Sequence, residues 1–387
     1  MFTMKNEVLH LIQAIHAAPH QLMLVIAGAG HGALSRLLDV AGASHTVLEA
    51  LVPYSQASFD DFLAHQPEQY VADQTARLLA GRAYTRARQL GSVDKLLFGV
   101  ACTAAITTNR AKRGEHRAHI ARWQRDSLAQ VELFLEKGAR TRLEEETLIS
   151  ELILNVIAEG CDLEPRLPLI LLPGDHLTIE RYSYRDPAQA LIAGERHYFG
   201  IEADGLPYPA NTPLPVILSG AFNPLHEGHL GMAQAAESVL NQPVVFELAA
   251  VNVDKPPLLA DEILARTSQF AGRYPVLVSD APTYIGKARL YPGATFVVGY
   301  DTAVRIFAPR YYNHSVDQMM AALAEIEALG CHFLVAGRVD EQGVFRSLAD
   351  VDIPARFASL FSPIPETLFR RDISSTTLRS TGQRGDR

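Results

Sequence analysis

The sequence has little cysteine, almost no tryptophan and no excess of basic charge. Its 387 residues include three cysteines and one tryptophan, and 35 Lys and Arg stand against 43 Asp and Glu, for a formal net charge of −8. Cys102, Cys161 and Cys331 lie far apart without CxxC or Cys/His ligand spacing. This excludes a disulfide scaffold or zinc module and indicates buried thiols in a reducing compartment. Because the chain has no excess of basic residues to attract phosphate groups, we do not expect nucleic acid as a partner.

Long hydrophobic runs are also missing. No stretch reaches the roughly 18 consecutive apolar residues that would span a bilayer, and polar residues interrupt segment 1–20 before a signal-like apolar core could form. We therefore expect a cytoplasmic protein without a membrane partner. With 48% apolar residues, a chain of this length can bury two or three cores. A homo-oligomer would be ordinary for such a protein.

Alternating strand and helix patterns predict an α/β protein of two domains. A helical pattern at 5–17 precedes the apolar run 22–30, and long helical patterns at about 68–90 and 118–160 lie on either side of the apolar run 95–100. These patterns predict an N-terminal α/β domain over 1–164. Short apolar runs and a proline-rich stretch predict short strands and a linker over 165–213, and a second domain with a parallel sheet over 214–387.

The clearest candidate site lies where that second domain begins. The apolar run 214–219 predicts a strand, GAFNPLHEGH follows at 220–229, and LGMAQAAESVL predicts a helix. A helix N-terminus offers unpaired N–H groups to phosphate, and Gly220 and Gly228 let the backbone approach a ligand closely. His226 and His229, three apart on one face, can each donate a hydrogen bond to a phosphate oxygen. The alternative is that the two histidines only cap and pack the helix start.

GAFNPLHEGH resembles the GxFxPxHxGH signature of the nucleotidyltransferase superfamily, and it matches that signature at every defined position. The resemblance implies a Rossmann-like fold with a parallel sheet and in-line nucleotidyl transfer. It also implies that His226 and His229 are catalytic. The ATP-binding residues implied in this segment are Gly220, Phe222, Asn223 and Gly228.

Three shorter segments extend the resemblance. ISSTTLR at 373–379 is similar to the ISSTxxR motif of the adenylyltransferase branch, which favours ATP over CTP, although a plain helix cap is the alternative. Gly299 and Asp301 resemble the GxD of nicotinamide and nicotinate mononucleotide adenylyltransferases, and Lys255 and Arg266 resemble their acceptor-binding lysine and arginine. Ordinary solvated charges remain open for Lys255 and Arg266. The resemblance of ISSTTLR implies that Arg379 is catalytic and that Ser374, Ser375 and Thr376 bind ATP.

The N-terminal domain resembles a second family. LDVAGAS at 38–44 and VPYS at 52–55 are similar to elements of the CinA carboxy-terminal family, whose active members are nicotinamide mononucleotide amidohydrolases. The turn at 27–32 has no serine, cysteine or threonine to act as nucleophile, and Phe59 stands where that family has a lysine. We expect a domain that is not catalytic. Its GAGHG turn could still hold a phosphate through backbone amides.

Both resemblances involve a nicotinamide metabolite. They imply transfer of AMP from ATP to a phosphorylated small molecule, nicotinamide or nicotinate mononucleotide by preference, with Mg²⁺ bridging the triphosphate and pyrophosphate leaving. One alternative is adenylyl or cytidylyl transfer to another phosphorylated acceptor such as phosphopantetheine. Another is a non-catalytic nucleotide-binding sensor or scaffold.

Overall fold

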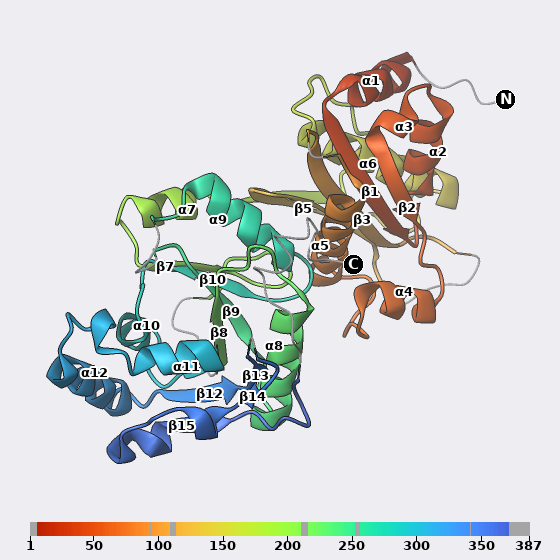
Figure 1. Cartoon of the computed structure of the whole chain (residues 1–387). Coiled ribbons are helices and arrows are strands. Elements are labelled where there is room, and N and C mark those ends of the chain that lie inside the picture. The colour runs from red at the N-terminus through yellow and green to blue at the C-terminus, as the bar shows by residue number, and fades with distance from the viewer. Residues whose placement is uncertain are drawn as a thin grey trace. The chain divides into compact units, whose positions relative to one another are not determined.

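The chain forms two compact α/β units (Figure 1). The computed structural model describes residues 6–92, 94–108, 114–209, 216–251, 256–340 and 342–370. Unit 1 comprises residues 1–185, 202–206 and 270–273, and unit 2 comprises residues 186–201, 207–269 and 274–387. Unit 1 is therefore built from three separate stretches of the chain.

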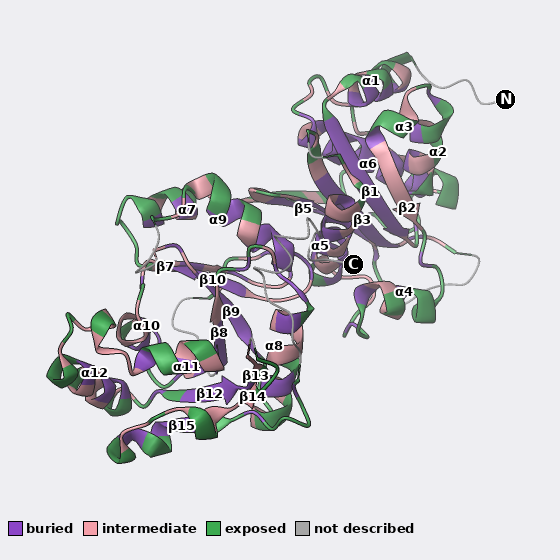
Figure 2. Ribbon diagram, in the orientation of Figure 1, coloured by how far each residue is buried: buried purple, intermediate pink, exposed green. Residues whose placement is uncertain are grey.

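Unit 1 is organised around a six-stranded mixed sheet of order β2-β1-β3-β4-β5-β6. Its strands are β1 (His20–Ala27), β2 (Val47–Leu51), β3 (Leu96–Ala105), β4 (His116–Gln124), β5 (Ser127–Leu135) and β6 (His176–Ser183). The pairs β1/β2 and β1/β3 are parallel, whereas β3, β4, β5 and β6 follow one another antiparallel. The buried residues of the central strands form the middle layer of the unit (Figure 2).

Helices cover both faces of this sheet. They are α1 (Asn6–Ala17), α2 (His31–Asp39), α3 (Ala43–Thr46), α4 (Gln56–Leu63), α5 (Asp73–Leu90) and α6 (Arg142–Gly160). Apolar side chains of α1, α2 and α6 share one core with alternate residues of β1 and β3, and α5 packs against β1, β3 and β4. A capping box between Thr141 and Glu144 fixes the start of α6.

The helical pattern predicted over 118–160 is wrong for its first half, because residues 116–135 form the hairpin of β4 and β5. Arg122 and Trp123 of this hairpin are both buried. Arg122 Nη1 donates to the Val156 carbonyl and packs near Glu159 of α6. Strand pairing overrides the helical preference of the alanines in this segment.

Unit 2 contains a seven-stranded sheet of order β15-β12-β11-β8-β9-β10-β7. Its strands are β7 (Tyr198–Ile201), β8 (Val216–Gly220), β9 (Val245–Ala249), β10 (Val276–Ser279), β11 (Thr295–Gly299), β12 (His332–Ala336) and β15 (Phe361–Pro363). All pairs are parallel except β7 with β10. The parallel sheet predicted for the C-terminal region is thus present.

The helices of unit 2 form a layer on each face of its sheet. They are α7 (Arg185–Ile192), α8 (Glu227–Leu240), α9 (Ala260–Thr267), α10 (Tyr284–Leu290), α11 (Tyr300–Ile306) and α12 (Val316–Ala328). Apolar residues of α10, α11 and α12 share a core with the sheet. Short 3-10 helices occur at Ser268–Phe270, Pro309–Tyr311, Leu348–Asp350 and Ala355–Leu360, and a small hairpin joins β13 (Arg338–Val339) to β14 (Phe345–Arg346).

The segment predicted as short strands and linker, residues 165–213, supplies one strand to each sheet. β6 pairs with β5 along its whole length, and β7 pairs with β10. Residues 210–215, which span the end of the predicted linker and the start of the predicted second domain, lie outside the described residues. Across the described part of the chain, no helix is long and apolar enough to cross a membrane.

Candidate active site

The site predicted from GAFNPLHEGH lies at the carboxyl edge of the unit 2 sheet. β8 ends at Gly220, and the chain then continues to β9 on one side of β8 and later to β11 on the other side. Such a switch in strand order opens a crevice at the carboxyl ends of the strands, which is where ligands bind in open α/β sheets. The loop 220–226 crosses this edge and leads into α8.

Phe222 anchors this loop in the core instead of lining a cavity. Its side chain is fully buried, and its ring meets the rings of His229 and Phe246 edge to face, with centroids 5.1 and 5.5 Å apart. A Cβ atom on Gly220 would lie 2.6 Å from the Phe222 ring. Glycine is therefore needed at position 220 to admit this ring, in addition to any approach of a ligand.

The two histidines stack at the start of α8. Their ring centroids lie 3.8 Å apart with an interplanar angle of 29°. His226 is the helix N-cap, and its Nδ1 accepts a hydrogen bond of 3.1 Å from the Gly228 N–H. His229 Nδ1 is buried and has no hydrogen-bond partner among the described residues. The neutral His226 ring therefore carries its proton on Nε2, an atom that can donate to a phosphate oxygen.

Burial holds both rings neutral in the free protein. Burial lowers the pKa of His226, and burial followed by the neighbouring His226 lowers the pKa of His229 from 6.5 to about 3. An anion bound beside the two rings would oppose this effect, because a nearby negative charge favours the imidazolium.

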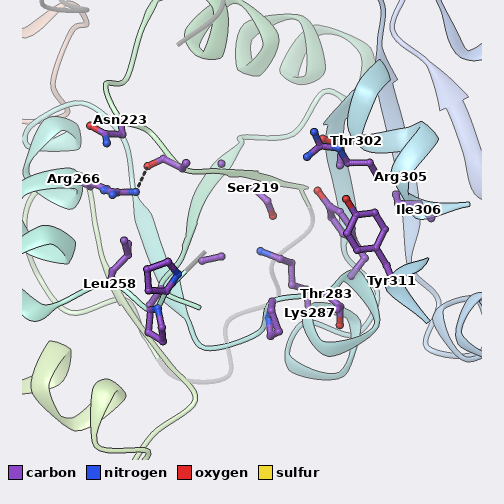
Figure 3. A pocket seen from close by; sticks show the side chains of 18 of the residues that line it. Ser219, Asn223, Leu258, Arg266, Thr283, Lys287, Thr302, Arg305, Ile306 and Tyr311 are labelled. Atoms are coloured by element: carbon purple, nitrogen blue, oxygen red, sulfur yellow. Dashed lines mark hydrogen bonds between the residues drawn. The ribbon is translucent and has the colours of Figure 1, made fainter. Parts of the chain in front are cut away.

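A cavity of about 720 Å³ adjoins the loop (Figure 3). This volume falls in the range of small-molecule sites. Arg266 and Leu258 lie on one side of the cavity, Arg305 and Tyr311 lie on the other, and Ser219 at the end of β8 lies between them. The remaining residues of its wall are Gly220, Ala221, Asn223, Ala249, Ala250, Pro256, Pro257, Glu262, Pro282, Thr283, Tyr284, Lys287, Thr302, Ile306 and Tyr312.

Two polar side chains from α9 and the turn after it hold the loop. Arg266 Nη1 donates to the Ala221 carbonyl at 3.1 Å, the dashed line in Figure 3. Buried Gln269 donates to the Phe222 carbonyl at 2.8 Å and accepts from the Leu225 N–H at 2.9 Å. Arg266, predicted to bind the acceptor, thus both lines the cavity and positions the loop.

The predicted GxD residues lie at the end of the neighbouring strand. Gly299 is the N-cap of α11, and Asp301 lies in the first turn of that helix. The Asp301 carboxylate forms an ion pair with Arg338 of β13, and both side chains are exposed. Thr302, the next residue, contributes to the cavity wall.

Of the other predicted site residues, Asn223 lines the cavity, and the Gly228 N–H donates a hydrogen bond to the His226 ring. Lys255, Ser374, Ser375, Thr376 and Arg379 lie outside the described residues.

Sequence reasoning missed a buried ion pair beside this cavity. Lys287 Nζ on α10 donates to Glu247 Oε2 on β9, and the Ser279 hydroxyl donates to Glu247 Oε1 at 2.6 Å. Glu247 is fully buried and Lys287 is 4% exposed. The one signal in the sequence was a glutamate inside the apolar strand VVFELAA.

The described residues offer no protein-built metal centre. They contain no group of three or more His, Cys, Asp or Glu side chains placed to hold an ion. The carboxylate in the cavity wall, Glu262, lies 3.7 Å from Arg266, and Asp301 is paired with Arg338.

In unit 1, the glycine-rich turn is filled by the protein's own carboxylate. The Gly30 and Gly32 N–H groups donate to Glu146 Oε2 and Oε1 at 2.8 and 3.0 Å, and the Ser150 hydroxyl donates to Oε1 at 3.2 Å. His31 Nδ1 lies 3.1 Å from Oε1. Glu146 thus occupies the place that the sequence left open for a phosphate.

A family model described as cytidylyltransferase-like matches residues 217–381. The match covers the strands of unit 2 from β8 onward, the HxGH loop and the cavity residues, and it confirms the nucleotidyltransferase resemblance of the C-terminal region. It supports nucleotidyl transfer as the general chemistry of that region. No curated protein matches the chain.

Several solved structures of competence- and damage-inducible proteins are similar to the N-terminal part of the chain. One from Agrobacterium tumefaciens is 20% identical and covers 41% of this chain and 99% of its own, with a TM-score of 0.34. One from Enterobacter asburiae is 13% identical, with coverage of 41% and 98% and a TM-score of 0.33. A CinA superfamily protein from Escherichia coli is 17% identical, with coverage of 41% and 88% and a TM-score of 0.30.

Proposed function

We propose that unit 2 transfers AMP from ATP to a phosphorylated small molecule, and that the acceptor is nicotinamide or nicotinate mononucleotide. The observation that carries the proposal is the pair of stacked histidines at the N-terminus of α8, with the buried Nδ1 of His229 unpartnered among the described residues. A buried polar atom without a partner is uncommon and calls for an explanation. Two stacked imidazole rings at the N-terminus of a helix can offer N–H groups to a triphosphate.

The reaction would be a direct displacement. A phosphate oxygen of the acceptor attacks the α-phosphorus of ATP in line, the bond from that phosphorus to the bridging oxygen breaks, and pyrophosphate leaves with the electron pair. His226 and His229 would donate to phosphate oxygens, and the N-terminus of α8 would favour the negative charge. Magnesium bound to ATP would neutralise the leaving phosphates. Positioning and charge compensation thus supply catalysis, without a covalent enzyme intermediate.

The experiment is pyrophosphate release from ATP and Mg²⁺ by the full chain, with nicotinamide mononucleotide, nicotinate mononucleotide and phosphopantetheine as acceptors. We expect release with one of the mononucleotides and a loss of about 10³-fold or more in the variant His226→Ala/His229→Ala. The variant His10→Ala/His332→Ala, which changes two exposed histidines, should keep the wild-type rate.

Each other outcome assigns a different function. Release with phosphopantetheine alone would replace the acceptor. Binding of ATP without release for any acceptor would contradict catalysis and favour a nucleotide sensor, which binds ATP but does not cleave it.

A further inference from the structure

The buried pair of Glu247 and Lys287 lies at the floor of the cavity. Two neighbours of Glu247, Ser219 and Ala249, lie in the cavity wall. Ser219 on β8 is paired with Glu247 across the sheet, and Ala249 lies two residues after Glu247 on β9. Glu247 therefore faces the same side of the sheet as Ala249. Lys287 reaches the cavity wall from α10 on that side.

Such a pair is costly to bury. Taking two charges out of water costs several kcal/mol per ion unless their geometry and hydrogen bonds compensate, and apolar residues of the same size often serve stability as well. Burial and the Glu247 carboxylate both raise the pKa of Tyr284, which is also in the cavity wall. The Glu247 charge therefore acts on a side chain of the cavity wall.

The charges of Lys287 and Glu247 neutralise each other before any ligand binds. Lys287 has three N–H bonds and donates one of them to Glu247. The described residues supply no second carboxylate within ion-pair distance of Lys287. A ligand thus meets an ammonium donor whose charge Glu247 already neutralises.

The position of the pair assigns it to the acceptor. The HxGH loop after β8 and the turn after β11 would hold the nucleotide, whereas Glu247 lies on β9, on the other side of β8 from β11 in the strand order. An acceptor that presents its phosphate to the HxGH loop would extend its other end toward α10. This step rests on the proposed function.

We propose that Glu247 and Lys287 select an acceptor whose base carries a neutral carboxamide over one whose base carries a carboxylate. Lys287 can donate to the carbonyl oxygen of a carboxamide and leave the pair neutral. A carboxylate in the same place would put a second negative charge beside buried Glu247, and like charges in a desolvated site repel strongly.

The other cations of the cavity do not alter this discrimination. Arg266 lies 3.7 Å from Glu262, and exposed Arg305 has no carboxylate partner among the described residues. Arg305 lies on α11 after β11, on the side assigned to the nucleotide, and it therefore faces the same ligand with either acceptor. Its contribution therefore cancels when the two acceptors are compared.

The test compares nicotinamide and nicotinate mononucleotides with the full chain, through kcat/KM for pyrophosphate release and through Kd measured by calorimetry. We expect wild type to prefer the amide by about tenfold or more. Glu247→Gln leaves Lys287 with an uncompensated charge and should shift the preference toward the acid by at least tenfold. If that variant does not fold, Glu247→Gln/Lys287→Met removes both charges and should reduce the preference for the amide by a similar factor.

The chain offers a matched control on the same helix. Arg289 of α10 pairs with Glu325 of α12 at 2.7 Å, and both side chains are exposed. Glu325→Gln should leave the ratio unchanged. A wild-type preference for the acid, or an unchanged ratio in the Glu247 variants, would overturn the proposal.

The two proposals can fail separately. Absence of pyrophosphate with both acceptors contradicts the proposed function, whereas the ratio of the two dissociation constants, measured without ATP, tests the selection alone. Equal affinities, or no binding of either mononucleotide, would contradict the selection.

Discussion

His229 is a buried imidazole that its surroundings keep neutral. Its ring stacks on His226, meets the edge of Phe222 and carries a buried Nδ1 without a partner among the described residues. Burial lowers its pKa to about 3, so the ring is neutral at pH 7. The lowered pKa reduces stability in acid, because His229 binds a proton more readily in the unfolded chain than in the folded protein.

The sign follows from linkage. Between pH 6.5 and about 3 the unfolded state binds more protons at position 229, so the free energy of unfolding falls as pH falls, by at most roughly 1.4 kcal/mol per pH unit for one proton. His229→Gln removes this contribution. We expect the stability difference, wild type minus variant, to decrease steadily from pH 7 to pH 4 in urea unfolding of unit 2 followed by circular dichroism.

The control for this titration is His10→Gln, which changes an exposed histidine of α1. It should leave the pH dependence of unit 2 unaltered. Parallel wild-type and His229→Gln curves would contradict a buried neutral ring, and would also weaken its role as a ligand for phosphate.

At this scale the sequence predicts residues that carry a local signature and misses those that depend on distant partners. His226 and His229 lie in one ten-residue motif, and the structure places them side by side. Glu247 and Lys287 are 40 residues apart, and nothing local to either predicts the other. The anchoring role of Phe222 was also unpredicted, because it depends on the space that Gly220 leaves.

Among the elements, the joint between β1 and α2 shows why unit 1 need not bind phosphate. Gly30 adopts a φ of 100° and presents its N–H to Glu146, and the Gly32 N–H meets the second oxygen of the same carboxylate. A carboxylate at a helix N-terminus makes the same contacts as an external anion would. Helix α6 thus supplies an internal anion to α2.

Removing the Glu146 carboxylate should lower the free energy of unfolding. Glu146→Ala leaves two backbone N–H groups without acceptors in a nearly buried site, and we expect a loss of about 3 kcal/mol in the free energy of unfolding. The single tryptophan, Trp123, is buried in unit 1, so its fluorescence during urea unfolding reports the change. Added sulfate should restore part of the stability, because it can enter the vacated turn.

A second carboxylate between the same helices serves as control. Glu151 of α6 lies 3.8 Å from Arg36 of α2, and Glu151→Ala should cost less than about 1 kcal/mol. Equal losses for the two variants would show that the turn does not depend on Glu146.

Element prediction succeeded where periodicity was clear and failed where packing decided. The strand before GAFNPLHEGH and the helix after it are confirmed as β8 and α8. Residues 118–135 fall in the predicted helical pattern of 118–160, yet they form a hairpin in which most positions of both strands are buried. Strands covered on both faces lose the alternation of polar and apolar residues that identifies a strand in sequence.

In the whole molecule, unit 1 is not a continuous stretch of chain. Residues 202–206 and 270–273 belong to it although the chain has already entered unit 2. Within unit 1, the Gly272 N–H donates to the Ala203 carbonyl and the Thr85 hydroxyl donates to the Ala271 carbonyl. Sequence patterns cannot reveal that segments 202–206 and 270–273 belong to unit 1, because their contacts involve backbone atoms far apart along the chain.

One ion pair should dominate the attachment of segment 202–206 to unit 1. Buried Arg77 of α5 donates from Nη2 to Asp204 at 2.8 Å and from Nη1 to Asp73 at 2.7 Å, and the Asp204 side chain is 9% exposed whereas that of Asp73 is 42% exposed. Asp204→Ala should therefore cost about 3 kcal/mol, since it leaves a buried charge short of its main partner. Asp73→Ala should cost less than about 1 kcal/mol. Trp123 fluorescence in urea unfolding measures both, and a larger loss for Asp73→Ala would show that segment 202–206 contributes little to unit 1.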